Sequence, residues 1–156
     1  AARIEERTFR GLVGYLGEEP SLWAECVFVD PVADIAILGA PDDQALPKES
    51  ERFQHMLFAS EKLRLGDSNG GRSWLLSLDR QWNVCSVEEM GARGYLISEA
   101  QCGVVGGMSG SPILSTDGAV IGVVATAAGD DGGGPNPRLS MHLPAWASQQ
   151  GAPHAS

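Results

Sequence analysis

The feature that most constrains the fold of this chain is the spacing of its turns, which divide the apolar residues into short runs. The 156 residues include 20 glycines and 9 prolines, and turn sequences stand at 17–20, 66–71, 116–118 and 130–137. The apolar runs between them are short and rich in β-branched residues, a composition typical of strands. Short strands at regular spacing predict an all-β fold, either a barrel or a sandwich.

The same pattern gives a first assignment of elements. Strands are expected at 9–16, 22–29, 34–38, 73–78, 95–97, 112–114, 119–127 and 139–143. Residues 48–65 are the exception, because the spacing of Phe53, Met56 and Leu57 fits either a short helix or an irregular insertion. A helical turn or two is expected at 143–150, where Pro144 suits a first helical position, and residues 151–156 are expected to form a disordered tail.

Charge and cysteine content narrow the possible partners. The formal charge is −9, from 20 acidic and 11 basic residues, and such a surface repels nucleic acid and anionic lipid. No apolar run approaches the ~18 residues of a membrane span. The spacing of Cys26, Cys85 and Cys102 fits no metal site, so we expect neither metal nor other cofactor. Free thiols without a signal-like N-terminus favour the cytoplasm, although one disulfide plus one free thiol remains an alternative.

The segment that carries chemistry is the glycine-rich stretch before the expected strand at 112–114. It reads Gly-Met-Ser-Gly-Ser-Pro over residues 107–112. A serine becomes a useful nucleophile when a base takes its proton and fixed donors stabilise the resulting oxyanion. A tight glycine-rich turn supplies the donors, and the backbone N–H groups of Gly107 and Ser109 are the candidates for an oxyanion hole. The alternative interpretation is an ordinary surface turn that joins two strands.

Two segments together resemble one enzyme family. Residues 107–112 resemble the Gly-x-Ser-Gly-Gly-Pro motif of trypsin-like serine peptidases, with Ser111 in place of the second glycine. Asp-Ile-Ala-Ile-Leu at 34–38 resembles the segment that carries the catalytic aspartate of that family. The likeness is greatest to bacterial HtrA-like and related trypsin-like peptidase domains. It implies that Ser109 is the nucleophile and that Asp34 orients the base.

The resemblance also implies a fold. It predicts a chymotrypsin-like double β-barrel over residues 1–150, with a first barrel that is incomplete at the N-terminus and a short C-terminal helix. Residues 1–60 would form the remainder of that first barrel and a connector, and residues 61–150 would form the second barrel. The substrate would be a protein or a peptide.

The histidine that the family places before its aspartate is missing from the sequence. The three histidines are His55, His142 and His154, and all follow Asp34. We interpret His55 as a solvated or half-buried helix residue and His142 as part of the last strand, beside the specificity pocket. The base would then come from an N-terminal segment or from another chain. The alternatives are a catalytically inactive trypsin-like domain that binds proteins or peptides and, less favoured, an unrelated β-barrel binding module.

Specificity is inferred from the residues that the resemblance places around the primary pocket. Gly103, six residues before Ser109, would form the floor with Val104 beside it, and Ala125, Thr126 and Ala127 would form the opposite wall. No charge is available there to pair with Lys or Arg, so we expect cleavage after small or medium apolar side chains.

Three further comparisons complete the assignment of the motif. Met108 replaces the aspartate that many animal proteases pair with a new N-terminus, so activation by that route is not expected. The Gly-Asp-Ser-Asn-Gly stretch at 66–70 is interpreted as a turn, because Asn69 breaks the Gly-Asp-Ser-Gly-Gly pattern and no strand that opens with proline follows it. The Gly-x-Ser-x-Gly elbow of α/β-hydrolases fits poorly too, since Ser111 occupies its second glycine position.

Overall fold

The chain folds mainly into antiparallel strands. The structure is a computed structural model that describes residues 9–60, 62–89, 95–125 and 137–143. It divides into two compact units, with the boundary between Glu61 and Lys62. We call residues before this boundary unit 1 and residues after it unit 2.

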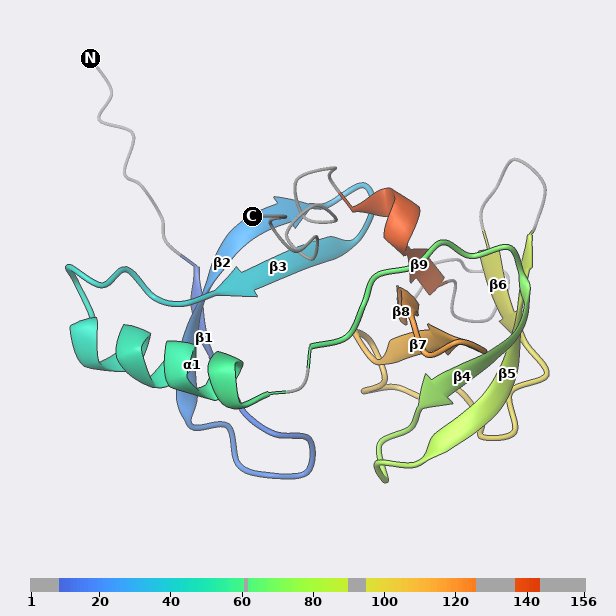
Figure 1. The fold of residues 1–156 in the computed structure, drawn as a ribbon, viewed down its shortest axis with the longest axis horizontal. Coiled ribbons are helices and arrows are strands. Elements are labelled where there is room, and N and C mark those ends of the chain that lie inside the picture. Colours follow the sequence, from blue (N-terminus) through green and yellow to red (C-terminus); the bar gives the residue numbers. More distant parts are fainter. Residues whose placement is uncertain (1–8, 61, 90–94, 126–136, 144–156) are drawn as a thin grey trace, which may run out of the picture. The chain divides into compact units, whose positions relative to one another are not determined.

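Unit 1 contains a small sheet and one helix (Figure 1). The sheet has three antiparallel strands in the order β1-β2-β3, namely β1 Arg10–Val13, β2 Leu22–Asp30 and β3 Ile35–Gly39. The helix α1 spans Pro47–Ala59. It begins with a proline, whose missing N–H is no loss in a first helical turn, and it buries Ser50 and Phe53. Of the two predictions for this region, the helix is therefore confirmed.

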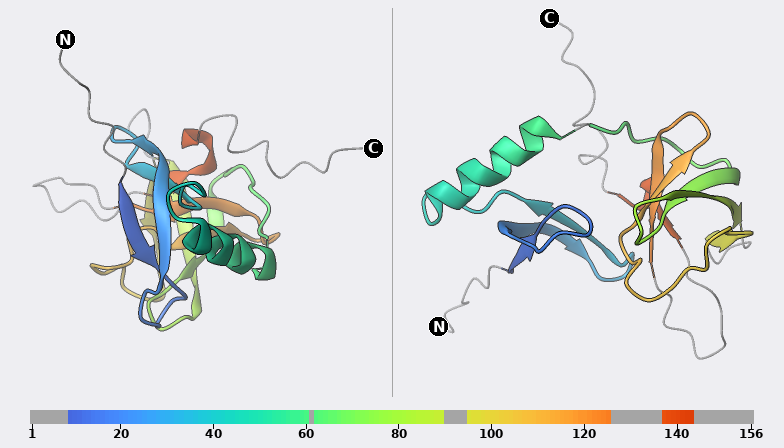
Figure 2. Two further views of the ribbon diagram at one scale, coloured as in Figure 1. Left: turned by 90° about the vertical axis from the view of Figure 1, so that its left-hand side faces the viewer. Right: turned by 90° about the horizontal axis from the view of Figure 1, so that it is seen from below.

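One face of this sheet is covered by α1, which contacts β2 (Figure 2). The register pairs Val13 with Leu22, and both side chains share a small cavity with Met56 of α1. Since neighbouring residues of a strand point to opposite faces, Leu12 and its partner Trp23 lie on the other side of the sheet. The helix therefore buries only one of the two faces.

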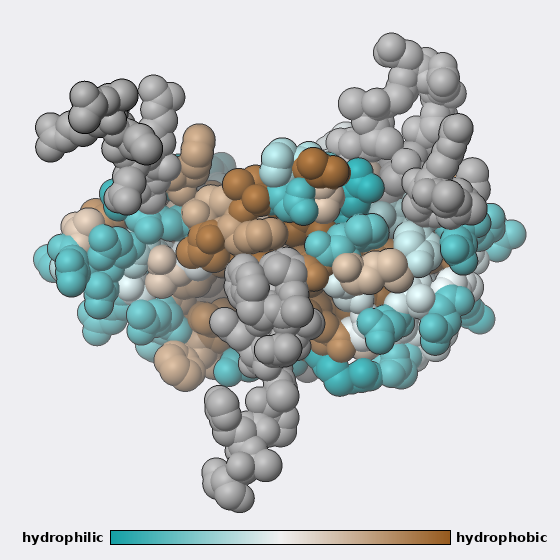
Figure 3. Space-filling model, turned by 90° about the horizontal axis from the view of Figure 1, so that it is seen from above, coloured by the Kyte–Doolittle hydropathy of each residue, from teal (hydrophilic) through white to brown (hydrophobic). Residues whose placement is uncertain are grey.

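The other face, which we call the open face, displays apolar side chains. Gly39 is paired with Glu25, two residues after Trp23, and therefore lies on this face. A Cβ atom on Gly39 would lie 2.9 Å from Cγ1 of Val27, which places Val27 there as well. Leu12, Trp23 and Val27 are 49%, 41% and 56% exposed. Figure 3 shows one side of the whole molecule, on which apolar residues reach the surface among hydrophilic ones.

Unit 2 is a nearly closed six-stranded antiparallel barrel. Its strands follow the order β6-β5-β4-β7-β8-β9, and the two end strands β6 and β9 contact each other. Their bounds are β4 Gly71–Leu76, β5 Trp82–Glu89, β6 Tyr95–Ser98, β7 Pro112–Ser115, β8 Val120–Val124 and β9 Pro137–Leu139, followed by the 3₁₀ helix η2 Ser140–His142.

The core of unit 2 comes from alternate residues of these strands. Ser73 and Leu75 of β4 face inward. Ser73 pairs with Cys85 of β5, and Leu75 pairs with Ile113 of β7. The buried cluster consists of Leu75, Cys85, Val87, Ile97, Met108, Ile113, Ile121, Val124 and Leu139. Every other member of this cluster lies in a strand, whereas Met108 lies in the turn before β7. The loop that carries the candidate nucleophile is therefore packed into the core through Met108.

The mainly β fold is confirmed, and several details of the sequence assignment are corrected. Strand β5 was not expected at all. Residues 140–142 form a 3₁₀ helix rather than the end of a strand, and β9 begins earlier, at Pro137. Asp34 does not open β3, since it lies in the preceding turn and the strand begins at Ile35. The expected C-terminal helical turn, apart from Leu143, and the expected tail lie outside the described residues.

Within the described ranges, no helix has both the length and the apolar character required to cross a bilayer.

Gly122 of β8 tests how tightly the barrel closes. A Cβ atom there would lie 2.4 Å from the carbonyl oxygen of Arg138 and 2.9 Å from Cα of Leu139, so β9 would have to move away. We expect Gly122→Ala to lower the free energy of unfolding by about 1–3 kcal/mol, as overpacking does elsewhere. Urea denaturation would measure the change. Gly106→Ala is the matched control, because a Cβ at Gly106 meets open space, and an equal loss in both variants would contradict the prediction.

Candidate active site

Ser109 lies in a pair of consecutive β-turns that precede β7. The N–H of Met108 donates to the carbonyl oxygen of Val105 at 3.2 Å, and the N–H of Ser111 donates to that of Met108 at 2.9 Å. The third residue of each turn is a glycine with positive φ, Gly107 at +95° and Gly110 at +85°. Type II turns require this conformation at the third position, which explains both glycines of the motif.

The second turn is tied to the end of β8. The N–H of Gly110 donates to the carbonyl oxygen of Val124 at 2.8 Å, and the N–H of Val124 donates to that of Ser111 at 2.9 Å. Ser109 therefore stands directly before a segment that is paired with the barrel wall.

The side chain of Met108 fixes the turn from the inside. It is 1% exposed, and its sulfur accepts the N–H of Val105 at 3.4 Å. In the sequence, Met108 was notable only as a departure from the aspartate of animal proteases. In the structure it packs with the apolar residues of the barrel, so its burial and the bonds to β8 hold the turn from two directions.

These bonds leave the N–H groups of Gly106, Gly107 and Ser109 unused among the described residues. Among the described residues, neither the N–H of Gly107 nor that of Ser109 has a protein acceptor, and both residues are exposed. The Ser109 hydroxyl likewise has no partner in this part of the chain. Free N–H groups in a rigid turn are suited to bind a developing negative oxygen, since they do not have to give up a bond within the protein.

The residues assigned to the substrate pocket occupy different environments. Gly103 is exposed, whereas Val104 packs against the core cluster that includes Val124. Ala125 is 3% exposed and directly follows Val124, so it adjoins the segment that holds the Ser109 turn. Thr126 and Ala127 lie outside the described residues. The structure thus brings Ala125 next to the turn and leaves the other assignments as predictions.

Asp34 belongs to unit 1, in the turn between β2 and β3. This turn is capped by Asp30, whose carboxylate accepts the N–H groups of Val32 at 2.9 Å and Ala33 at 3.0 Å. Asp34 is exposed, and its φ of +55° falls in the left-handed region. Aspartate tolerates this region better than most residues, so backbone conformation gives a second reason for an aspartate at this position.

The two histidines in the described residues have different roles. His55 is exposed on α1 of unit 1, as the sequence indicated. His142 is half-buried in η2, where its Nδ1 accepts the N–H of Leu139 at 2.9 Å. That bond caps the start of the short helix and engages only Nδ1 of the ring. His154 lies outside the described residues.

The resolved pKa shifts belong to structural groups. A hydrogen bond from Ser77 lowers the pKa of Asp79, and one from Ser115 lowers that of Asp117; each pair forms part of a hairpin turn. Burial, with a smaller contribution from Cys102, raises the pKa of Cys85 to about 11, so this thiol stays protonated near neutral pH. All three cysteines are free. In the described ranges, no group of three His, Cys, Asp or Glu residues is arranged to hold a metal ion.

Comparison with protein-family models, with curated proteins and with solved structures found no match.

Asp34 provides a test that separates backbone from side-chain requirements. We expect Asp34→Ala to destabilise unit 1 by about 1–2 kcal/mol, because alanine is strained at positive φ. Asp34→Asn should change stability by much less, since asparagine also tolerates this region. Thermal unfolding would measure both variants. Equal destabilisation by Asn and Ala would show that the carboxylate charge, rather than φ, decides the residue at this position.

Proposed function

We propose that this chain carries the nucleophile of a serine endopeptidase, with Ser109 as the attacking residue. The observation that carries the proposal is the Ser109 turn, which holds an exposed serine on a segment bonded to β8 and leaves the N–H groups of Gly107 and Ser109 without acceptors among the described residues.

In the proposed reaction, a base removes the proton of Ser109 Oγ while the oxygen attacks the carbonyl carbon of the substrate's peptide bond. The N–H groups of Gly107 and Ser109 donate to the resulting oxyanion. Expulsion of the amine, protonated by the same base, leaves an acyl-enzyme that water hydrolyses. Asp34 orients the base in this scheme, as its resemblance to the family's aspartate implies.

The base itself is proposed to come from an N-terminal segment or from another chain. His142 is engaged through Nδ1 in capping η2, and neither His55 nor His142 stands where the resemblance expects the base. In this proposal, unit 2 is the second barrel of a chymotrypsin-like fold, and the sheet of unit 1 is part of the first.

The open face of unit 1 supports the proposal that its sheet is only part of a first barrel, which further strands would complete. Leu12, Trp23 and Val27 leave apolar area in water on that face. Strands β1 and β3 are both edges of the sheet, and within the described residues no strand pairs with their outer sides. Added strands that bury apolar area and pair with an edge would stabilise unit 1.

A second candidate function is a catalytically inactive domain that binds proteins or peptides. The observation that favours it is that the Ser109 hydroxyl has no hydrogen-bond partner among the described residues, so no base in that part of the chain is engaged with it. Without a base, the turn would still bind a carbonyl oxygen through the N–H groups of Gly107 and Ser109.

Fluorophosphonate labelling with imidazole as a substitute base tests the first proposal. A serine without its histidine is expected to react on the order of 10⁶-fold more slowly than a complete triad. Added imidazole should therefore accelerate labelling of Ser109 in proportion to its concentration, as measured by mass spectrometry of the intact chain and its peptides.

The matched controls are Ser109→Ala and Ser68→Ala. Ser68 also lies in a glycine-rich loop before a paired strand, β4, but its hydroxyl accepts the N–H of Gly70 at 3.2 Å, whereas that of Ser109 has no partner among the described residues. Labelling should disappear in Ser109→Ala and persist in Ser68→Ala. Labelling that imidazole does not accelerate, or that is lost equally in both variants, would exclude an activated Ser109. Peptide binding without any labelling would favour the inactive domain.

Specificity follows from the absence of charge among the proposed pocket residues. Peptidyl phosphonates with alanine or valine at the position before the scissile bond should label Ser109 faster than the matching lysine or arginine compounds, under the same imidazole conditions. One missing methylene in an apolar pocket changes rates only about 10–200-fold, so we expect a preference of that order among apolar residues. Faster labelling by the arginine compound would contradict the assignment of Gly103 and Ala125 to the pocket.

A further inference from the structure

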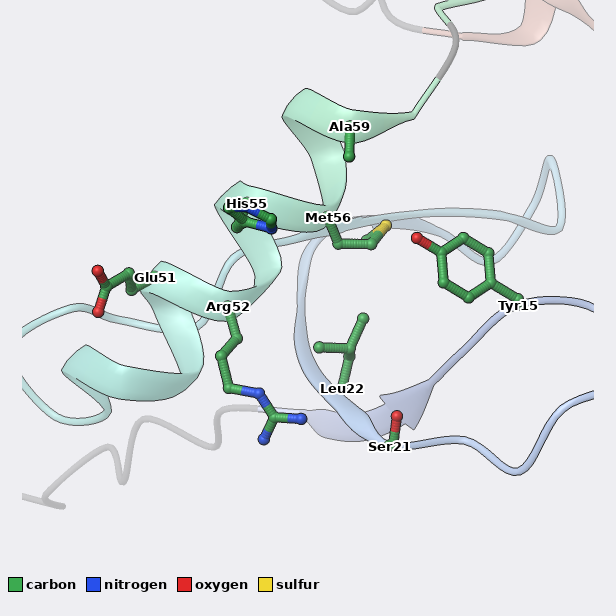
Figure 4. A pocket seen from close by; sticks show the side chains of 8 residues that line it. All are labelled: Tyr15, Ser21, Leu22, Glu51, Arg52, His55, Met56 and Ala59. Carbon is green, nitrogen blue, oxygen red and sulfur yellow. The ribbon is translucent and has the colours of Figure 1, made fainter.

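A groove in unit 1 lies between α1 and the β1–β2 hairpin, with a volume of about 560 Å³ (Figure 4). This volume falls within the range of small-molecule sites, about 300–1,000 Å³. All of its lining residues come from unit 1, so the groove is independent of Ser109 and of unit 2.

The groove combines an apolar surface with hydrogen-bond donors. Leu22 and Met56 supply apolar surface from β2 and α1, and Tyr15 and Ser21 each contribute a hydroxyl group. Within the described residues, neither hydroxyl has a hydrogen-bond partner. A ligand that binds here therefore needs both an apolar part and an acceptor group.

The lining includes two charged residues, Arg52 and Glu51, and Arg52 is the one that favours a negatively charged acceptor on the ligand. Figure 4 shows its side chain extending from α1 toward Ser21 and Leu22, whereas Glu51 points away from it. In the described part of the chain, the guanidinium of Arg52 forms no ion pair, although unit 1 is richer in acidic than in basic residues. A guanidinium without a carboxylate partner binds a ligand carboxylate through two parallel hydrogen bonds.

We propose that this groove binds a carboxylate that is attached to an apolar side chain, as at the C-terminus of a peptide or in a free N-acylated amino acid. Arg52 pairs with the carboxylate, and the hydroxyl groups of Tyr15 and Ser21 donate to its remaining lone pairs. Leu22 and Met56 contact the apolar side chain. An uncharged isostere loses the pairing with Arg52 and leaves the guanidinium without a partner.

N-Acetyl-leucine and N-acetyl-leucinamide form the decisive pair of probes, titrated into the full ¹⁵N-labelled chain. The acid should shift the amide resonances of Leu22, Arg52 and Met56 with a Kd in the millimolar range, which corresponds to about −4 kcal/mol. The amide should bind at least tenfold more weakly. Equal binding of acid and amide, or shifts that map elsewhere, would overturn the proposal without any variant.

Arg52→Gln adds a second test, with Arg72→Gln as its matched control. Both arginines are exposed, but Arg72 lies on β4 of unit 2, near the ring of Trp74. Arg52→Gln should lose at least tenfold in affinity for N-acetyl-leucine, whereas Arg72→Gln should bind like the parent chain. Retained affinity in Arg52→Gln would refute the role of the guanidinium. The resonances of β2 and β3 would verify that unit 1 remains folded in Arg52→Gln, and those of β5 would do the same for unit 2 in Arg72→Gln.

A longer probe distinguishes the two sources of the carboxylate, a peptide C-terminus and a free N-acylated amino acid. Acetyl-Ala-Ala-Leu should bind more tightly than N-acetyl-leucine if the groove recognises peptide C-termini, and equally if it recognises small free acids. Both results support the carboxylate chemistry. Loss of binding by the tripeptide and by the single residue alike would count against it.

Discussion

The candidate site depends on two backbone hydrogen bonds between the Ser109 turn and the end of β8. They join Gly110 to Val124 and Val124 to Ser111, and they continue the pairing of β7 with β8 past the end of the strands. The first bond uses the N–H of Gly110 and the second uses the carbonyl oxygen of Ser111, whose own N–H donates to Met108 within the turn. The barrel therefore fixes the turn directly after Ser109, and the N–H groups of Gly107 and Ser109 take no part in these bonds.

The two units solve the problem of burying apolar area in different ways. In unit 2, contact between β6 and β9 brings the six-stranded sheet back upon itself, so side chains such as Leu75 and Ile113 become fully buried. In unit 1, a sheet of three strands is too small to close, and α1 covers only one of its faces. Trp23 and Val27 remain in water on the other face. The proposed need for more strands thus has its physical basis in unit 1, while the proposed chemistry has its basis in unit 2.

Local patterns in the sequence were sufficient for the parts of the fold that local interactions determine. The glycines at 107 and 110 predicted a tight turn, and the structure gives both a positive φ. The apolar spacing around Phe53 allowed a helix, which formed. Strand β5 was missed because its buried residues, Cys85 and Val87, alternate with polar ones in too short a run to stand out. Its place between β4 and β6 depends on pairing with residues distant in the sequence, a contribution that a local pattern does not contain.

The same distinction explains why the sequence suggested a candidate nucleophile more readily than a complete candidate site. The geometry around Ser109 is set by neighbours in the turn and by one strand, so a short motif can encode it. The reactivity of Ser109 depends on a base, and only the tertiary structure can bring a base from a distant part of the sequence to Ser109. His142 illustrates the difference. Its position late in the chain suggested the last strand, beside the specificity pocket. In the structure it lies in η2, where Nδ1 accepts the backbone N–H of Leu139. A prepared turn and an activated serine are separate properties, and each requires its own measurement.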